Sequence, residues 1–320
     1  MRRRDFIALL GGAAVEWPLA ARPAAARIAR LGIIDDSPLW DPFRQQLREL
    51  NYVDGKNIAF EYRRADGAPD RLFAAADALA KLPVDVIAVF GTPAAQAAQQ
   101  ATRTVPVVAI AVGDPVGTGL VSSYGHPGGN ITGNTILGTD VATKRLQVLK
   151  DAIPAVSRVV YLWNPDNASS ATILQETLKA APLFQMTVVS LEARTADDFD
   201  RVFAAMSADR PDAVLASLDP FHQTQMGRVI DFLLKNRIPG MYQIRKNVAD
   251  GGLMSYGAAF SDLFRRGAVY VDKIFRGTKP ADLPIEEPLT FQLIVNLKTA
   301  RAIGVDFPQT LLARADEVIE

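Results

Sequence analysis

Residues Val84–Gln100 read VDVIAVFGTPAAQAAQQ and decide the fold of this chain. The segment 84–90 is almost wholly apolar, which is typical of a strand that a parallel sheet buries on both faces. Gly91 ends this run, Thr92 is the predicted N-cap of the Ala/Gln-rich helix that follows, and Pro93 fits the first helical turn. The free N–H groups of that helix therefore lie at the carboxyl end of a strand, where open α/β sheets bind ligands and favour an anion or carboxylate. An ordinary capped βα turn explains the same residues, so a functional interpretation requires similar turns elsewhere.

Strands and helices alternate through the rest of the chain in two successive series, each about half of its length. This order predicts an α/β fold with two doubly wound lobes, each built on a parallel sheet. The tail after Pro284 has no evident place in such a sequential division. The predicted strands are 28–34, 58–62, 84–90, 105–112, 131–137, 158–163, 186–191, 213–218, 238–242, 253–256 and 289–296, and the predicted helices include 43–50, 72–79, 116–123, 144–153, 172–183, 195–206, 226–236 and 261–275.

Composition excludes several classes of function. The 320 residues include 35 basic and 35 acidic ones, so the formal net charge is zero. The chain therefore lacks the net positive charge that would indicate a nucleic acid or a membrane surface as partner. The absence of cysteine excludes disulfides, thiol nucleophiles and cysteine-ligated metals. Two histidines, His126 and His222, supply metal sites and catalytic triads poorly. We therefore expect neither a metal nor a cofactor.

The N-terminus predicts export. Arg3–Ile7 (RRDFI) resembles a twin-arginine signal, and the apolar stretch Phe6–Val15 is too short to span a bilayer. An Ala-rich stretch follows, and cleavage after Ala26 fits its small residues. We assign residues 1–26 to a twin-arginine-type export signal and expect the mature protein in the periplasm. The alternative is a basic N-terminal extension of a cytoplasmic protein.

Several predicted strands end in polar or turn-forming residues. Asp and Asn at such ends cap helices, which explains each of them alone. Both halves of the chain carry them, however, and two facing halves would line one cleft, the usual form of a small-molecule site. These strand ends are 35–37 (DDS), 91–93 (GTP), 113–115 (GDP), 164–166 (NPD) and 219–221 (DPF).

Roles in such a cleft follow from side-chain chemistry. The Thr92 hydroxyl and the neighbouring helix N–H groups suit a carboxylate, whereas Asp114 or Asp219 suits an ammonium or hydroxyl group. Aromatic side chains near the strand ends are candidates for stacking on a flat ligand, with core packing as the alternative. These aromatic residues are Trp163, Phe221, Tyr242 and Tyr256.

Motifs spread over essentially the whole chain point to one known family. They are 1–14 (MRRRDFIALLGGAA), 90–98 (FGTPAAQAA), 112–123 (VGDPVGTGLVSS), 127–133 (PGGNITG), 163–167 (WNPDN), 218–221 (LDPF), 251–257 (GGLMSYG), 296–304 (NLKTARAIG) and 308–320 (PQTLLARADEVIE). Together they resemble the ABC-transporter substrate-binding protein family, related to tryptophan/tyrosine-type binding components with the type I periplasmic-binding fold.

The resemblance implies two lobes joined by three crossings around a central cleft. Lobe one would comprise 28–138 and 252–284, and lobe two 139–251 and 285–320, which gives the tail a place. It further implies an exported, non-catalytic component of an ABC importer that captures an amino acid or an aromatic or carboxylate solute by hinge closure. We expect a monomer that delivers this solute to a membrane permease with its ATPase. The ligand-binding residues carried over by position are Asp36, Ser37, Thr92, Pro93, Asp114, Asn164, Asp219, Phe221, Tyr242 and Tyr256.

Two other functions remain open. An exported α/β enzyme would use Asp219, His222 or Asp114 for acid–base chemistry in the same cleft, although histidine is scarce. The ligand-sensing core of a transcription regulator shares the architecture. Against it, no DNA-binding helix pair precedes the first strand, and the export signal is inconsistent with that role.

Overall fold

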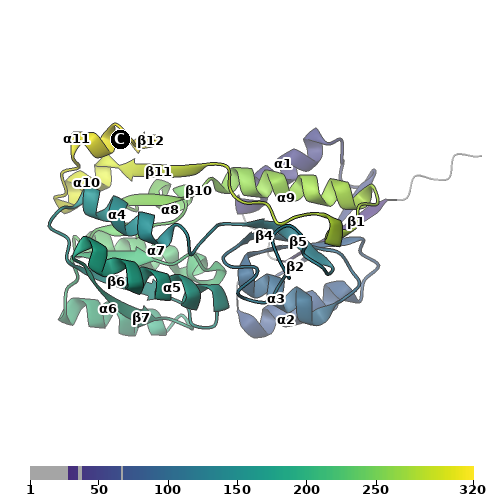
Figure 1. Ribbon diagram of the computed structural model, residues 1–320, viewed down its shortest axis with the longest axis horizontal. Coiled ribbons are helices and arrows are strands. Elements are labelled where there is room, and N and C mark those ends of the chain that lie inside the picture. Colours follow the sequence, from purple (N-terminus) through teal and green to yellow (C-terminus); the bar gives the residue numbers. More distant parts are fainter. Residues whose placement is uncertain (1–27, 35–37, 66–67) are drawn as a thin grey trace, which may run out of the picture.

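The computed structural model describes residues 28–34, 38–65 and 68–320, without the side chains of Pro38 and Pro69. These residues form two α/β lobes that lie side by side, each around its own sheet (Figure 1). The predicted α/β class and the two-lobed architecture are confirmed. The predicted export signal, residues 1–26, and the candidate residues Asp36 and Ser37 lie outside the described residues.

Lobe one is built on a five-stranded sheet in the order β2-β1-β3-β4-β5, with every neighbouring pair parallel. Its central strands β3 and β4 are continuous apolar runs because helices cover both faces of the sheet. Helices α2 and α3 cover one face, and α1 and α9 cover the other. The bounds are β1 Ala29–Ile34, β2 Ile58–Arg63, β3 Val86–Phe90, β4 Val107–Val112, β5 Ile131–Thr135, α1 Asp41–Glu49, α2 Pro69–Ala80, α3 Gly91–Ala101 and α9 Phe260–Phe275, with short 3₁₀ helices at Pro38–Trp40 and Pro280–Asp282.

Lobe two is built on a seven-stranded sheet in the order β12-β11-β10-β9-β8-β6-β7. Helices α4 and α5 cover one face of its central strands, and α6 and α7 cover the other. The pair β10–β11 is antiparallel, which departs from the purely parallel sheet that the sequence predicts. The bounds are β6 Arg158–Trp163, β7 Thr187–Glu192, β8 Ala213–Ala216, β9 Gly240–Tyr242, β10 Met254–Ala258, β11 Phe291–Asn296, β12 Glu317–Ile319, α4 Ala142–Ala152, α5 Ala168–Ala180, α6 Asp198–Ala208, α7 Pro220–Lys235, α8 Arg245–Ala249, α10 Leu297–Ile303 and α11 Gln309–Leu312, with a 3₁₀ helix at Ala181–Phe184.

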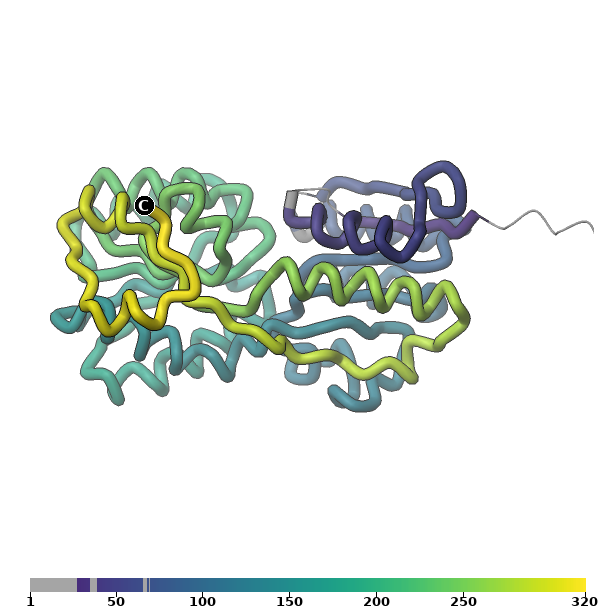
Figure 2. Tube along the Cα trace, turned by 90° about the horizontal axis from the view of Figure 1, so that it is seen from above, coloured from purple at the N-terminus to yellow at the C-terminus, as the bar shows by residue number. Residues whose placement is uncertain are grey.

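Three crossings join the lobes, as the family resemblance implied (Figures 1 and 2). They lie between β5 and α4, between β10 and α9, and between the 3₁₀ helix Pro280–Asp282 and β11. The third crossing is tied to the edge of lobe one, because the Glu286 amide donates to the Gly133 carbonyl over 3.0 Å. Strand β10 pairs with β9 and β11 in lobe two, and only the following helix α9 packs on lobe one. The boundary that we expected at residue 252 therefore lies at the crossing between β10 and α9.

Two local predictions are wrong at the ends of elements. Residues 116–123 form turns rather than a helix, and the Asp114 side chain accepts a 2.8 Å hydrogen bond from the Gly117 amide at their start. Helix α3 begins at Gly91 with Phe90 as its N-cap, so Thr92 is not the N-cap. The Thr92 hydroxyl is instead engaged in tertiary contacts, described below. Of the helices in the described part of the chain, not one has the length and apolar character that a membrane span requires.

Candidate functional site

The hydroxyl of Thr92 connects the two lobes. Thr92 lies in the first turn of α3 in lobe one and is buried. Its Oγ1 accepts a 3.2 Å hydrogen bond from the backbone amide of Gly113, which follows β4. The same oxygen donates a 3.1 Å hydrogen bond to Oγ of Ser169, in the first turn of α5 in lobe two. One side chain thus joins two strand ends of lobe one to a helix N-terminus of lobe two.

The network continues through buried side chains of lobe two. Ser169 Oγ donates to Asn167 Oδ1 over 2.9 Å, and Asn167 Nδ2 donates to Asp219 Oδ2 over 3.0 Å. The other carboxylate oxygen of Asp219 accepts from Asn164 Nδ2 over 3.2 Å and from the His222 amide over 2.9 Å. Asn167 is the N-cap of α5 and Asp219 is the N-cap of α7. The caps at two strand ends of lobe two, together with Ser169, therefore form a continuous network that reaches Thr92 in the other lobe.

Glycine allows the lobes to approach closely beside this network. A Cβ atom added to Gly91 would lie 2.9 Å from Cγ of Pro220 in the opposite lobe, and the backbone φ of +79° at Gly91 also disfavours a side chain. A Cβ atom added to Gly113 would lie 2.5 Å from Ser169 Oγ. The cavity that remains between the lobes at this contact measures about 10 Å³. The lobes thus meet here at distances that only glycine tolerates.

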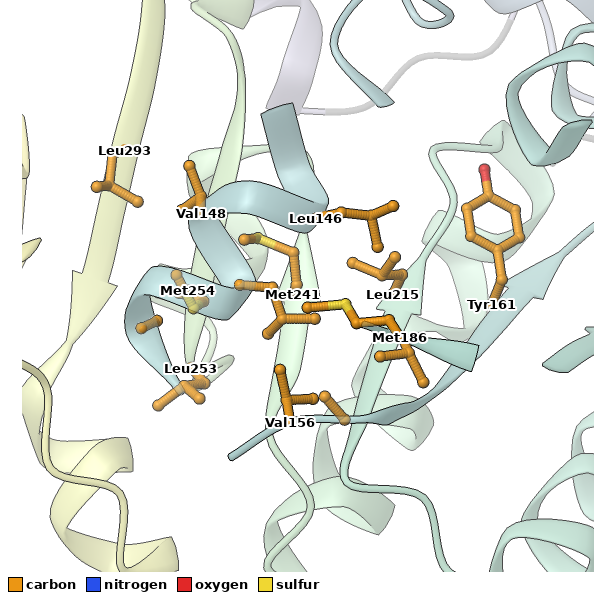
Figure 3. Packing of buried hydrophobic residues seen from close by; sticks show 14 of the residues in the cluster. Leu146, Val148, Val156, Tyr161, Met186, Leu215, Met241, Leu253, Met254 and Leu293 are labelled. Atoms are coloured by element: carbon orange, nitrogen blue, oxygen red, sulfur yellow. The ribbon is translucent and has the colours of Figure 1, made fainter. Parts of the chain in front are cut away.

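A second group of polar residues lies at the carboxyl end of the lobe-two sheet. The strand register aligns four residues in a single row. Two of them lie in β6 and β10, and the other two directly follow β8 and β9. These row residues are Trp163, Ser217, Gln243 and Tyr256. Because side chains alternate between faces, they share the face of the core residues two positions earlier. Those core residues, shown in Figure 3, are Tyr161, Leu215, Met241 and Met254.

Several polar atoms of this group have no hydrogen-bond partner in the described part of the chain. They are Trp163 Nε1, Ser217 Oγ, Gln243 Oε1 and the neighbouring Tyr161 hydroxyl, all buried. Figure 3 shows the Tyr161 hydroxyl pointing away from the labelled aliphatic side chains. A buried polar group without a partner costs about 1–3 kcal/mol and is rare in folded proteins. Four such atoms at one end of a sheet indicate unused capacity for binding a polar group.

Arg145 of α4 adds a positive charge to this group. Its Nε donates a 3.0 Å hydrogen bond to the Tyr256 carbonyl, and its side chain is 5% exposed. No carboxylate among the described residues forms an ion pair with it. Burial lowers the pKa of Arg145 to about 10, an effect opposed by the nearby phenols of Tyr161 and Tyr256. The guanidinium is thus a buried cation without a counter-charge.

The structure distributes the predicted site residues among different environments. Thr92, Asn164 and Asp219 come together in the interlobe network. Pro93 is half-buried beside Thr92 in the first turn of α3, and Asp114 is half-buried after β4, where it caps a turn. The interlobe contact thus combines residues from both halves of the chain, as the paired strand ends indicated.

The four predicted aromatic contacts differ in their surroundings, and one of them, Trp163, belongs to the row described above. Tyr256 belongs to the row at the sheet end, where its ring stacks on Phe291 with centroids 6.2 Å apart. Phe221 is half-buried and packs against Phe199 of α6 at 6.3 Å. Tyr242, only 1% exposed, is packed in the core on the sheet face that α6 and α7 cover. The structure therefore does not bring Tyr242 together with the interlobe network.

Sequence reasoning missed five residues of these groups: Arg145, Asn167, Ser169, Ser217 and Gln243. Asn167 had a usable signal, because an Asn that directly precedes a helix is a good N-cap. Arg145 lies on an amphipathic helix, and the sequence carried no signal for its role.

His222 has a structural environment. Its ring Nε2 lies 2.7 Å from the Ala193 carbonyl, and Asp219 accepts the backbone amide of His222 rather than its ring. Across the described ranges, no three His, Asp or Glu side chains gather in a way that could hold a metal ion. The acid–base pair that the enzyme alternative requires is not formed by these two residues, so this alternative is not favoured.

Comparison with known proteins identifies the family. Residues 39–319 match the family model described as "ABC transporter substrate binding protein". The chain belongs to this family. This substrate-binding protein is therefore the solute-binding component of an ABC transporter, as its motifs predict.

Its relatives include proteins with related names and folds. A tyrosine-binding protein of Clostridioides difficile is 25% identical over 264 residues, which cover 82% of this chain and 75% of that protein. A conserved domain protein from Vibrio cholerae has a solved structure that superposes with a TM-score of 0.84 at 26% identity, covering 92% of this chain and 99% of the other. An ABC domain from Streptococcus pneumoniae, solved with L-Trp, gives a TM-score of 0.85 at 24% identity over 91% of this chain and all of the other.

Proposed function

We propose that this substrate-binding protein captures an aromatic amino acid or a related aromatic carboxylate between its lobes and delivers it to a membrane permease with its ATPase. The observation that carries the proposal is the buried hydrogen-bond network from Thr92 in lobe one to Asp219 in lobe two. Contacts that form only when the lobes meet stabilise the closed form relative to the open form. A solute that touches both lobes would shift the population towards the closed form.

The proposed ligand class rests on relatives and on local chemistry. One relative is named a tyrosine-binding protein, and a similar structure holds L-Trp. In this chain Trp163, Phe221 and Tyr256 place aromatic surface at the strand ends of lobe two, where they would stack on a ring. Ten contacts were predicted from the sequence, and the proposal keeps all of them except the core residue Tyr242. The nine that remain are Asp36, Ser37, Thr92, Pro93, Asp114, Asn164, Asp219, Phe221 and Tyr256.

A thermal-shift panel tests this proposal. The mature protein, residues 27–320, is melted with L-tryptophan, L-tyrosine, L-leucine, benzoate and glucose. A solute that binds only the folded state stabilises it by about 2.7 kcal/mol at a hundredfold excess over its dissociation constant. We expect the aromatic amino acids to raise the melting temperature and glucose to leave it unchanged. No shift with any aromatic or carboxylate compound would contradict the proposed ligand class.

The proposal includes export by the twin-arginine route to the periplasm, and action as a monomer. The order of arginine pair, short apolar stretch and Ala-rich stretch in residues 1–26 supports the route. Replacing Arg3 and Arg4 with lysine should leave the precursor inside the cell. Periplasmic accumulation of this variant would contradict the twin-arginine assignment, and a dimer in sedimentation analysis would contradict the monomer.

A further inference from the structure

Arg145 forms no ion pair with a described residue, whereas six other arginines of lobe two each pair with a carboxylate. Those arginines lie nearer to the surface, each with a carboxylate: Arg158–Asp209, Arg194–Asp166, Arg201–Asp198, Arg228–Asp200, Arg245–Glu317 and Arg314–Asp151. Arg145 is more deeply buried than these arginines, and among the described residues its one acceptor is the Tyr256 carbonyl. Burying a cation is unfavourable unless it is paired, so the fold holds Arg145 in an unfavourable state.

The residues around Arg145 offer both hydrogen-bond donors and acceptors. Trp163 Nε1 can only donate, whereas Gln243 Oε1 can only accept, and the Ser217 hydroxyl can do either. All three atoms are buried and lack partners in the described part of the chain. They lie at the carboxyl ends of the adjacent strands β6, β8 and β9, and neighbouring strands in a sheet are about 4.8 Å apart. A headgroup with a carboxylate and an ammonium would use donors and acceptors at this spacing.

We propose that Arg145 binds the carboxylate of the captured solute, and that Ser217 and Gln243 bind its ammonium group. This inference rests on the proposed function, which it deepens by assigning the α-amino-acid headgroup to lobe two. Thr92, which we expected to bind the carboxylate, already donates its hydroxyl proton to Ser169. Arg145 in contrast has a full charge and unengaged donors, and a guanidinium pairs with a carboxylate in bidentate geometry.

A comparison of ligands with and without a carboxylate tests the assignment. L-tryptophan and tryptamine differ by that group, and their affinities for wild type, Arg145→Met and Arg145→Lys are measured by calorimetry. Removing one partner of a buried charge pair weakens binding strongly, so we expect Arg145→Met to weaken L-tryptophan about 100-fold. Tryptamine should change less than about threefold, and Arg145→Lys should retain part of the preference. Equal losses for both ligands would overturn the proposal.

The matched control is Arg301→Met. Arg301 is also a helical arginine of lobe two whose Nε donates to a backbone carbonyl, that of Leu297 over 3.1 Å, but its side chain is exposed. This variant should bind both ligands like wild type. A loss like that of Arg145→Met would trace the effect to net charge rather than to position, and would overturn the assignment.

Melting of the ligand-free protein decides the role of Arg145 independently of the ligand class. If the cation awaits a ligand, Arg145→Met removes an uncompensated buried charge and should melt at the same or a higher temperature than wild type. If Arg145 serves only to hold Tyr256, the variant should melt lower, and that result overturns the proposal. Failure of wild type to bind either compound would count against the proposed ligand class, while the melting comparison still decides whether Arg145 is structural.

Discussion

The hydroxyl of Thr92 donates a 3.1 Å hydrogen bond to the hydroxyl of Ser169, although the two residues belong to different lobes and are 77 positions apart. Both are buried, and Thr92 also accepts the Gly113 amide. Contact between the lobes therefore depends on specific hydrogen bonds that single substitutions can remove.

Thr92→Val should destabilise the protein more than Ser169→Ala. The valine leaves the buried Gly113 amide without an acceptor, which costs about 1–3 kcal/mol, and it also loses the hydrogen bond to Ser169. Ser169→Ala keeps that acceptor and loses two hydrogen bonds, with Thr92 and with Asn167, each worth about 1 kcal/mol. Urea unfolding at pH 7 measures both, with Thr92→Ser as the control that retains the hydroxyl. A cost for Thr92→Val no larger than that for Ser169→Ala would show that the Gly113 contact contributes little.

Gly113→Ala should oppose closure. The added methyl group would lie 2.5 Å from Ser169 Oγ, so either the lobes separate or the helix start of α5 shifts. Overpacking of this kind costs about 1–3 kcal/mol, and we expect the affinity for L-tryptophan to fall about tenfold. Small-angle scattering should show a larger radius of gyration with ligand than wild type has.

The control for this substitution is Gly227→Ala. Gly227 lies in α7, and an added Cβ would meet nothing within 4 Å, so this variant should keep its affinity and gain about 1 kcal/mol of stability. If Gly113→Ala behaved like Gly227→Ala, the close approach of the lobes would not matter for binding.

Asp219→Ala should be strongly destabilising. It removes the N-cap of α7, worth about 0.5–2 kcal/mol, and leaves the amides of Asn164 and Asn167 without their acceptor. Each such buried donor adds about 1–3 kcal/mol. Asp219→Asn keeps an oxygen for one donor and should lose less, as measured by urea unfolding. Because Asn caps a helix as well as Asp does, a loss near zero for Asp219→Asn would mean that capping, rather than the network, accounts for the effect.

The contribution of Asp212 to stability should depend on pH. Hydrogen bonds from the backbone amides of Arg158 and Ser157 lower the pKa of this carboxyl below its usual value. Because the folded pKa is depressed, the stabilisation is present above the unfolded pKa, near 3.9, and is lost as the pH falls through the folded pKa. Wild type should therefore be more stable than Asp212→Asn at pH 7, and the difference should shrink on approaching pH 2.5. A difference independent of pH would contradict this origin.

Much of the fold was predictable because its signals are local. Buried strands such as Val86–Phe90 are continuous apolar runs, and Asp219 before a proline-led helix is a typical N-cap. The same strand ends provided Thr92, Asn164 and Asp219, which the structure joins. Local signals failed where tertiary contacts decide, as when the Thr92 hydroxyl binds across the lobes instead of capping its own helix.

The second polar group could not be predicted from the sequence. Ser217 and Gln243 become neighbours only through the register of β8 and β9, and each is a single polar residue after an apolar strand. Arg145 lies on a helix whose charged residues otherwise indicate a solvated face. Conversely, Tyr242 is a plausible aromatic contact by its position at a strand end, but side-chain alternation turns it into the core.

A crystal structure of the mature protein with the solute that gives the largest thermal shift tests the central proposal most directly. We expect density for that solute between the lobes, in contact with residues of both, and with the hydrogen bond between Thr92 and Ser169 formed. Density confined to the outer surface of one lobe would contradict capture between the lobes.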